Sequence, residues 1–126
     1  MRRALLVGPY GSNLGDDLIG SAIASELLQS GYSVTVTSDS SAPFGNSLPV
    51  ESVAGCRLRA LRPGSLGHVA SADVIVIGGG EQLSEPRLPN PIWGHLANSC
   101  LHAEWGALRG TPTFLWSVGV GDTVSW

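Results

Sequence analysis

The chain has 126 residues, of which 43% are hydrophobic and only 13% charged, and its formal net charge is −3. A chain of this length suits one domain with a core of its own. All seven cationic residues are Arg and they form no basic stripe, which argues against nucleic acid as a partner, because binding a phosphate backbone needs clustered positive charge.

The N-terminal residues carry no recognisable targeting or membrane signal. Arg2 and Arg3 precede a short apolar run, Ala4–Val7, which is too short for the apolar centre of a secretion signal. No stretch approaches the ~20 apolar residues of a membrane span. Cys56 and Cys100 have no metal-ligand spacing and fit thiols in a reducing compartment. We therefore expect a cytoplasmic protein with no membrane span, no metal site and no cofactor.

The first third of the chain predicts a strand, a loop and a helix. The apolar run Arg3–Val7 is typical of a buried strand, which we expect to end at Gly8. After a loop, Leu14–Ser30 carries apolar residues at helical spacing. Asn13 is placed to cap this helix, and Gly31 is placed to stop it.

The rest of the chain continues to alternate strands and helices. We expect strands over Ser33–Thr37, Arg57–Leu61, Asp73–Ile77 and Thr113–Val118, and helices over Pro63–Ser71 and Ile92–Arg109. Such alternation implies a parallel sheet with right-handed crossovers. The expected fold class is therefore α/β, with a Rossmann-like parallel sheet and helices on both faces.

A loop rich in glycine and acidic residues lies between the first strand and the first helix. Gly11 and Gly15 let a ligand approach the backbone, and the helix start after Asn13 offers free N–H groups. Asp16 is the best candidate for a base or for a group that orients a hydroxyl. The alternative is a plain helix start, with Asn13 as cap and with Asp16 and Asp17 complementing the helix dipole.

Two further glycine turns follow predicted strands. Ligands in parallel sheets bind beyond the carboxyl ends of the strands, so turns that begin at Gly8, Gly78 and Gly119 should line one cleft. The alternatives without a ligand are a sharp turn at the three consecutive glycines, 78–80, and a solvent-exposed carboxylate at Glu81. The predicted catalytic residue is Asp16, and the predicted substrate-binding residues are Gly11, Asn13, Gly15, Asp17, Gly78, Gly79, Gly80, Glu81, Gly119 and Gly121.

Taken together, these residues resemble the polysaccharide pyruvyl transferase family. That family typically has a loop with the Gly, Asn, Gly and Asp found here between Gly11 and Asp16, and often an acid where Asp17 stands. The other matching segments are Ala72-Asp73, the glycines 78–80, Gly110-Thr-Pro112 and Gly119-Val120-Gly121. One departure is Glu81-Gln82, where members more often have glycine or an apolar residue.

The resemblance implies transfer of a pyruvyl group from phosphoenolpyruvate to a sugar of a cell-surface polysaccharide. It also implies a two-lobed, glycosyltransferase-B-like fold, of which residues 1–126 form the N-terminal, acceptor-side lobe. The second lobe, thought to hold the Arg and His residues that grip phosphoenolpyruvate, is missing from this sequence. We therefore expect a truncated chain that is inactive without a C-terminal lobe.

Three other interpretations remain open at this point. A nucleotide-binding Rossmann domain would use Asp39 on a ribose, although the glycine spacing differs from the G-x-G-x-x-G fingerprint. A lobe of a sugar-nucleotide glycosyltransferase would share the same layout. A non-catalytic fragment would show an exposed apolar face.

Overall fold

The computed structural model describes residues 1–11, 14–38, 48–54, 63–79 and 95–118. Their strands and helices are β1 (Arg2–Tyr10), α1 (Leu14–Gln29), β2 (Tyr32–Ser38), β3 (Glu51–Ala54), α2 (Pro63–Ser71), β4 (Val74–Gly78), α3 (His95–Arg109) and β5 (Thr113–Trp116). The strands form one sheet in the order β3-β2-β1-β4-β5, and every neighbouring pair is parallel. The predicted α/β class and parallel sheet are confirmed.

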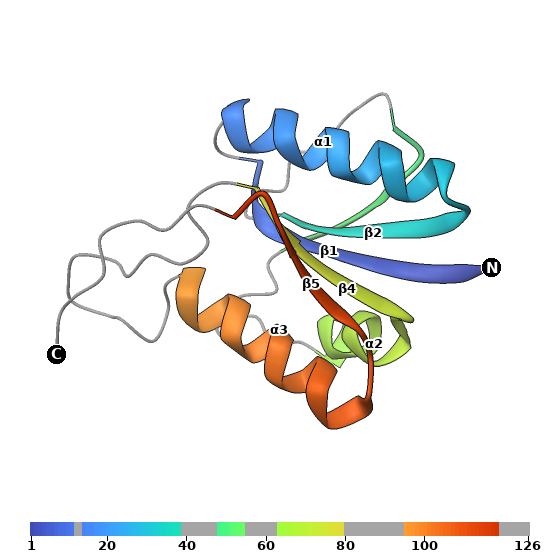
Figure 1. The fold of residues 1–126 in the computed structure, drawn as a ribbon, viewed down its shortest axis with the longest axis vertical. Coiled ribbons are helices and arrows are strands. Elements are labelled where there is room, and N and C mark those ends of the chain that lie inside the picture. The colour runs from blue at the N-terminus through green and yellow to red at the C-terminus, as the bar shows by residue number, and fades with distance from the viewer. Residues whose placement is uncertain (12–13, 39–47, 55–62, 80–94, 119–126) are drawn as a thin grey trace, which may run out of the picture.

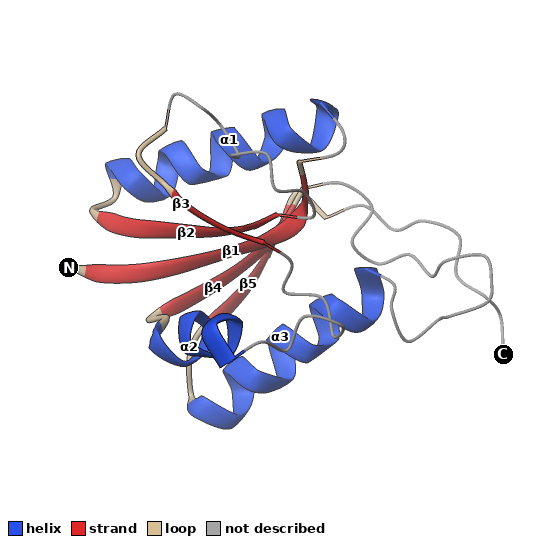
Figure 2. Cartoon of the chain, turned by 180° about the vertical axis from the view of Figure 1, so that it is seen from behind, coloured by secondary structure: helices blue, strands red, loops and turns tan. Residues whose placement is uncertain are grey.

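Helices cover both faces of the sheet, as the alternating pattern predicted. Figure 1 shows α1 on one face and α2 with α3 on the other, and Figure 2 shows the same layers from behind. Alternate residues of β1 explain this arrangement, because Ala4 and Leu6 pack in the core beneath α1, whereas Leu5 and Val7 pack beneath α2 and α3. All four are at most 2% exposed, as expected for a central parallel strand.

The end of β1 differs from the prediction, which placed it at Gly8. The strand continues to Tyr10, and its register with β2 shifts between Leu6 and Tyr10, so that four steps along β1 match two along β2. The Gly8 N–H donates a hydrogen bond of 3.4 Å to the buried hydroxyl of Thr37. An irregularity of this kind bends a strand without ending it, which is why glycine and proline here do not mark a loop.

The described part of the sheet contains one strand that the sequence did not predict. It is β3, a four-residue strand at the edge of the sheet that pairs with β2. The predicted strand Arg57–Leu61 falls outside the described residues. A short edge strand that begins with Glu51 and Ser52 carries too little apolar periodicity to be recognised from the sequence.

The helix boundaries follow the sequence closely. Helix α1 begins at Leu14, and Gly31 follows its end with a φ of 82°, in the left-handed region that favours glycine. After α3, Gly110 has a φ of 69°, and the next N–H, that of Thr111, bonds the Gly106 carbonyl at 2.8 Å. These are the αL endings typical of helix C-termini.

Two strand ends fall short of the prediction by one or two residues. Strand β4 begins at Val74, and the preceding Asp73 bonds to Arg3 twice: its backbone N–H donates to the Arg3 carbonyl at 2.8 Å, and its carboxylate accepts the Arg3 N–H at 2.7 Å. Strand β5 ends at Trp116, and Ser117 turns the chain with a φ of 52°. The first three residues of the predicted helix Ile92–Arg109 lie outside the described part of the chain.

Candidate functional site

Tyr10 is the centre of the carboxyl edge of the sheet. Its side chain is completely buried, and its hydroxyl donates a hydrogen bond to the backbone carbonyl of Gly78, at the end of β4. The phenol therefore joins the ends of two neighbouring strands, at the edge where parallel sheets place their ligands.

Two glycines make room for the Tyr10 ring. A Cβ atom at Gly8 would lie 2.3 Å from the ring Cζ, and one at Gly20 would lie 2.4 Å from the ring Cε1. Both distances are far below van der Waals contact, so any other residue at either position would displace the ring. Gly8 comes from β1 and Gly20 from the middle of α1, so the ring is held between a strand and a helix.

The turn after β4 lies against the same ring. Gly79 has a φ of 83°, and a Cβ built there would lie 3.3 Å from Tyr10 Cε1 and 3.4 Å from Cγ2 of Ile19 in α1. The Gly79 N–H donates to the Trp116 carbonyl at 3.3 Å. The ends of β1, β4 and β5 and the first turns of α1 thus meet around one buried side chain.

Asp17 fixes the loop that enters α1. Its Oδ1 atom accepts the backbone N–H of Gly11 at 2.7 Å, and the side chain is half-buried. A charged acceptor on a backbone N–H forms one of the stronger kinds of protein hydrogen bond. This contact supports the interpretation of Asp17 as part of the helix start, next to its predicted role in substrate binding.

The electrostatics of this edge are acidic. Burial raises the pKa of the Tyr10 phenol well above its ordinary value, and the nearby charges of Asp16 and Asp17 raise it further. The phenol therefore stays protonated and remains a hydrogen-bond donor. Asp16 is half-buried in the first turn of α1, where the helix dipole favours its negative charge.

The described cations lie at the other edge. Arg2 and Arg3 begin β1, and Arg109 ends α3 just before β5 begins. Within the described ranges, no arginine lies at the turns around Tyr10. We call the group formed by Tyr10, Gly11, Gly15, Asp16, Asp17, Gly78 and Gly79 the carboxyl-edge site.

The other predicted site residues fall outside the described part of the chain. These are Asn13, Gly80, Glu81, Gly119 and Gly121, and Asp39 of the alternative nucleotide-binding interpretation lies there too. No group of three His, Cys, Asp or Glu side chains that could hold a metal ion occurs among the described residues. None of the helices described is long and apolar enough to cross a membrane.

Tyr10 is the residue that the sequence interpretation missed, because it was assigned to a loop. The feature of the sequence that indicates its buried ring is Gly20, in the middle of α1. A glycine in the middle of a helix costs about 1 kcal/mol relative to alanine, and such a residue usually has a packing reason. Here the reason is the aromatic ring that the helix must accommodate.

A comparison with known protein families identifies one family model that matches the chain. The family model described as polysaccharide pyruvyl transferase matches residues 13–126. No curated protein and no solved structure matches the chain at a significant level. The matched range covers nine-tenths of the sequence and includes Gly15, Asp16 and the glycine turn after β4. The chain therefore belongs to the polysaccharide pyruvyl transferase family.

Proposed function

We propose that this chain is the acceptor-side lobe of an enzyme that moves a pyruvyl group from phosphoenolpyruvate to a sugar of a cell-surface polysaccharide. The observation that carries the proposal is the half-buried carboxylate of Asp16, whose charge acts on the Tyr10 phenol, against which the glycine turn after β4 also lies, in a chain of this family. A carboxylate next to open backbone suits a ligand that brings hydroxyl groups.

Asp16 is the group we propose for handling the acceptor hydroxyl. Ketal formation requires the sugar oxygens to bond to the central carbon of the enolpyruvyl group while the methylene carbon gains a proton and phosphate leaves. Each hydroxyl must lose its proton as its oxygen attacks. A positioned carboxylate takes that proton or orients the hydroxyl, which contributes about 10²–10⁴-fold to a rate.

The donor phosphate needs cations that the carboxyl-edge site lacks among its described residues. Phosphoenolpyruvate carries about three negative charges near neutral pH, from a nearly dianionic phosphate and a carboxylate. Each close approach to Asp16 or Asp17 costs about 1 kcal/mol even when the surroundings screen as well as water. The start of α1 offers only about half a positive charge. We infer that the donor is held by a second lobe.

Exposed apolar side chains support a partner surface at this edge. Leu14 and Leu18 in the first turns of α1 are 75% and 63% exposed, and Trp116 at the end of β5 is 42% exposed. Leu14 directly precedes Gly15, and the Trp116 carbonyl accepts the Gly79 N–H, so both elements border the carboxyl-edge site. Exposed apolar surface beside a site is typical of a region that another domain or protein covers, which agrees with a site shared between two lobes.

The test is a reconstitution. The purified chain is incubated with phosphoenolpyruvate and candidate acceptor sugars, alone and together with the C-terminal lobe of a longer family member, and phosphate release is followed. We expect turnover only in the mixture. Turnover by the chain alone would mean that the donor site has been assigned to the wrong lobe, and no turnover in any mixture would reject the proposed transfer.

A further inference from the structure

A polar hollow lies on the face of the sheet covered by α2, near the beginnings of the strands. On this face the parallel register places Arg3 beside Ser33 and Leu5 beside Thr35, and Thr35 is followed by Glu51 on the next strand, β3. Buried parallel strands are normally apolar on both faces. Strand β2 is apolar only on the α1 face, where its valines join the core. Its polar face therefore calls for an explanation.

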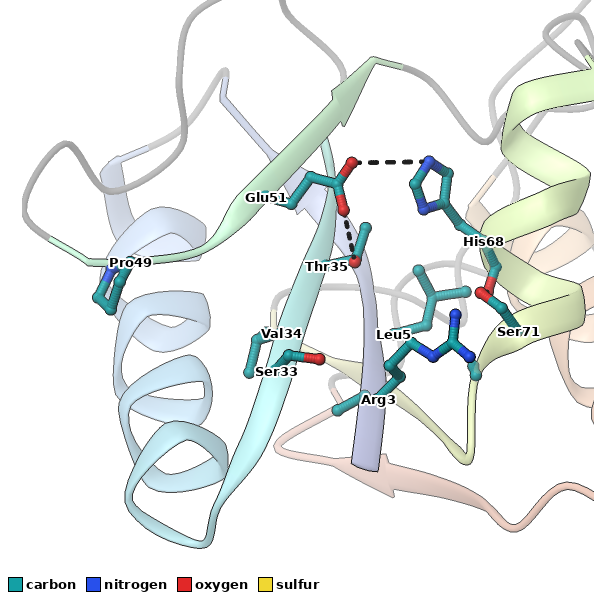
Figure 3. A pocket seen from close by; sticks show the side chains of 11 residues that line it. Arg3, Leu5, Ser33, Val34, Thr35, Pro49, Glu51, His68 and Ser71 are labelled. Atoms are coloured by element: carbon teal, nitrogen blue, oxygen red, sulfur yellow. Dashed lines mark hydrogen bonds and ion pairs between the residues drawn. The ribbon is translucent and has the colours of Figure 1, made fainter. Parts of the chain in front are cut away.

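This polar face forms one wall of a pocket. The pocket has a volume of about 370 Å³ and lies between β1, β2 and β3 on one side and α2 on the other. Figure 3 shows Glu51 and His68 facing each other across it, with Arg3 and Ser71 nearer its other end. Its volume is within the range of pockets that hold small ligands.

The hydroxyl groups of the pocket already donate to the protein. Thr35 donates to Glu51 Oε2 at 3.2 Å, Ser71 to the His68 carbonyl at 3.2 Å, and Ser33 to the Arg2 carbonyl at 3.4 Å. A hydroxyl has one proton but two lone pairs. These oxygens therefore remain available to a ligand as acceptors.

Glu51 adds a charged acceptor to the same wall. Besides the bond from Thr35, its Oε1 atom lies 3.9 Å from Nε2 of His68. Its side chain is 62% exposed, whereas that of His68 is 29% exposed. The carboxylate thus accepts a hydrogen bond from Thr35 and still reaches the open part of the pocket, so a ligand that approaches it must bring hydrogen-bond donors.

Arg3 supplies the one charged donor without a partner among the described lining residues. Its backbone N–H is bonded to Asp73, but no carboxylate in the described ranges pairs with its guanidinium. The neighbouring Arg2 is different, because its guanidinium lies 5.0 Å from the centre of the Tyr32 ring. A guanidinium binds a carboxylate with two parallel hydrogen bonds.

We propose that this pocket binds a small hydroxylated monocarboxylate, such as a sugar acid. The carboxylate of the ligand pairs with Arg3, and its hydroxyls donate to Glu51 and to the serine and threonine oxygens. The guanidinium of Arg3 matches the single negative charge of the ligand. Because Glu51 offsets the charge of Arg3, the pocket has no further positive charge for a second one. A dianion such as inorganic phosphate meets the repulsion of Glu51 and binds less well.

The pocket is separate from the carboxyl-edge site. Tyr10 follows Arg3 by seven steps along β1, and at about 3.3 Å per step this is roughly 20 Å. The proposal therefore does not depend on pyruvyl transfer, and binding at one site is measurable when the other fails.

The test is a nuclear magnetic resonance titration of the ¹⁵N-labelled 126-residue chain with sodium glucuronate, glucose and inorganic phosphate. We expect glucuronate to move the amide signals around Arg3, Thr35 and Glu51 in a saturable way and to bind more tightly than the other two. Absence of saturable shifts at these residues, or equal binding of inorganic phosphate, would overturn the proposal.

Two variants with a matched control sharpen the result. Arg3→Gln should weaken glucuronate binding about tenfold or more. A hydrogen bond to a charged group contributes at least the free energy that corresponds to a tenfold change in the dissociation constant. Arg2→Gln, one residue away but outside the pocket, should leave the affinity unchanged. An equal loss in both variants would show general charge attraction and reject the site.

Glu51→Gln keeps an acceptor but removes the negative charge, so phosphate binding should strengthen. Unchanged phosphate binding would reject the role given to Glu51.

Discussion

The Tyr10 hydroxyl and the Gly78 carbonyl form a hydrogen bond that joins the ends of β1 and β4. Both groups are buried, so neither can turn to water if the other is removed. This bond sets the spacing between the turn after β4 and the loop that leads into α1, and the carboxyl-edge site depends on that spacing.

Replacing Tyr10 with phenylalanine should therefore destabilise the fold. The ring remains, but the Gly78 carbonyl loses its partner in a buried place, which costs about 1–3 kcal/mol in unfolding free energy. Urea denaturation monitored by circular dichroism measures this loss. The control is Tyr32→Phe, at a half-buried tyrosine, which should stay within about 0.5 kcal/mol of the wild type. Equal effects in the two variants would contradict the role given to the Tyr10 bond.

The stability of the protein should also depend on pH in the alkaline range. The pKa of Tyr10 is raised in the folded state, chiefly by burial and further by Asp16 and Asp17, whereas in the unfolded chain it is about 10. Because the unfolded chain releases this proton first, the contribution of Tyr10 is complete below about pH 10 and is lost as the pH rises further.

Comparison with Tyr10→Phe isolates this effect. Between about pH 9 and pH 11.5, the wild type should lose more unfolding free energy than the variant. The chain contains no lysine, so no lysine ammonium group titrates in this window. Parallel pH profiles for the two proteins would show that the Tyr10 phenol is not specially protected.

A methyl group at Gly20 should destabilise the protein although alanine is the better helix former. Gly20→Ala gains up to about 1 kcal/mol in helix propensity but places a Cβ atom 2.4 Å from the Tyr10 ring. Overpacking of this kind costs about 1–3 kcal/mol. The matched control is Gly67→Ala in α2, where nothing lies within 4 Å of the added atom. The midpoint of thermal unfolding should be higher than that of the wild type for Gly67→Ala and lower for Gly20→Ala. A stabilised Gly20→Ala would mean that the space between Gly20 and the Tyr10 ring can hold an added methyl group.

Asp16 and Glu26 allow the catalytic proposal to be tested on one helix. In the reconstitution mixture with a C-terminal lobe, Asp16→Asn should lower the turnover number about 10²–10⁴-fold, as the proposed role of a general base requires. Glu26→Gln changes an exposed carboxylate in the last turns of α1 and should leave turnover as it is. A small effect of Asp16→Asn on turnover, with a folded protein, would remove Asp16 from the chemistry.

Asp17 should act through structure. Asp17→Ala removes the acceptor of the Gly11 N–H and should lower the unfolding free energy by about 1.5–3 kcal/mol, the usual range for a hydrogen bond to a charged group. Asp17→Asn keeps an oxygen at this position and should restore part of the loss. Urea unfolding of the two variants provides the measurement, and equal stability of Asp17→Ala and the wild type would contradict the structural role.

Sequence reasoning succeeded where one local rule was sufficient. The start of α1 at Leu14 and the bounds of α2 at Pro63–Ser71 follow from capping, spacing and proline placement, and the structure confirms them. It failed where a distant partner decides the outcome. Strand β1 continues through Gly8 because β2 and α1 support the irregular segment, and no local pattern contains that information.

The candidate site shows the same division. That Asp16 lies at a helix start and Gly79 at a strand end could be derived from the sequence, but their common neighbour could not. Tyr10 joins them, and its hydroxyl bonds to Gly78, which lies 68 positions away along the chain. A buried side chain of this kind is recognised only when the sheet order is known.

The glycine slot around Tyr10 also constrains how relatives of this protein can diverge. The ring fills the volume that a side chain at position 20 would need, so positions 10 and 20 vary together. A relative with a small residue in place of the tyrosine can carry alanine at position 20, whereas a relative that keeps the tyrosine should keep this glycine. Gly8 should remain glycine in both cases, because a Cβ atom there would also lie 2.6 Å from the backbone carbonyl oxygen of Gly78. Substitutions at positions 10 and 20 are therefore expected to covary in an alignment of the family.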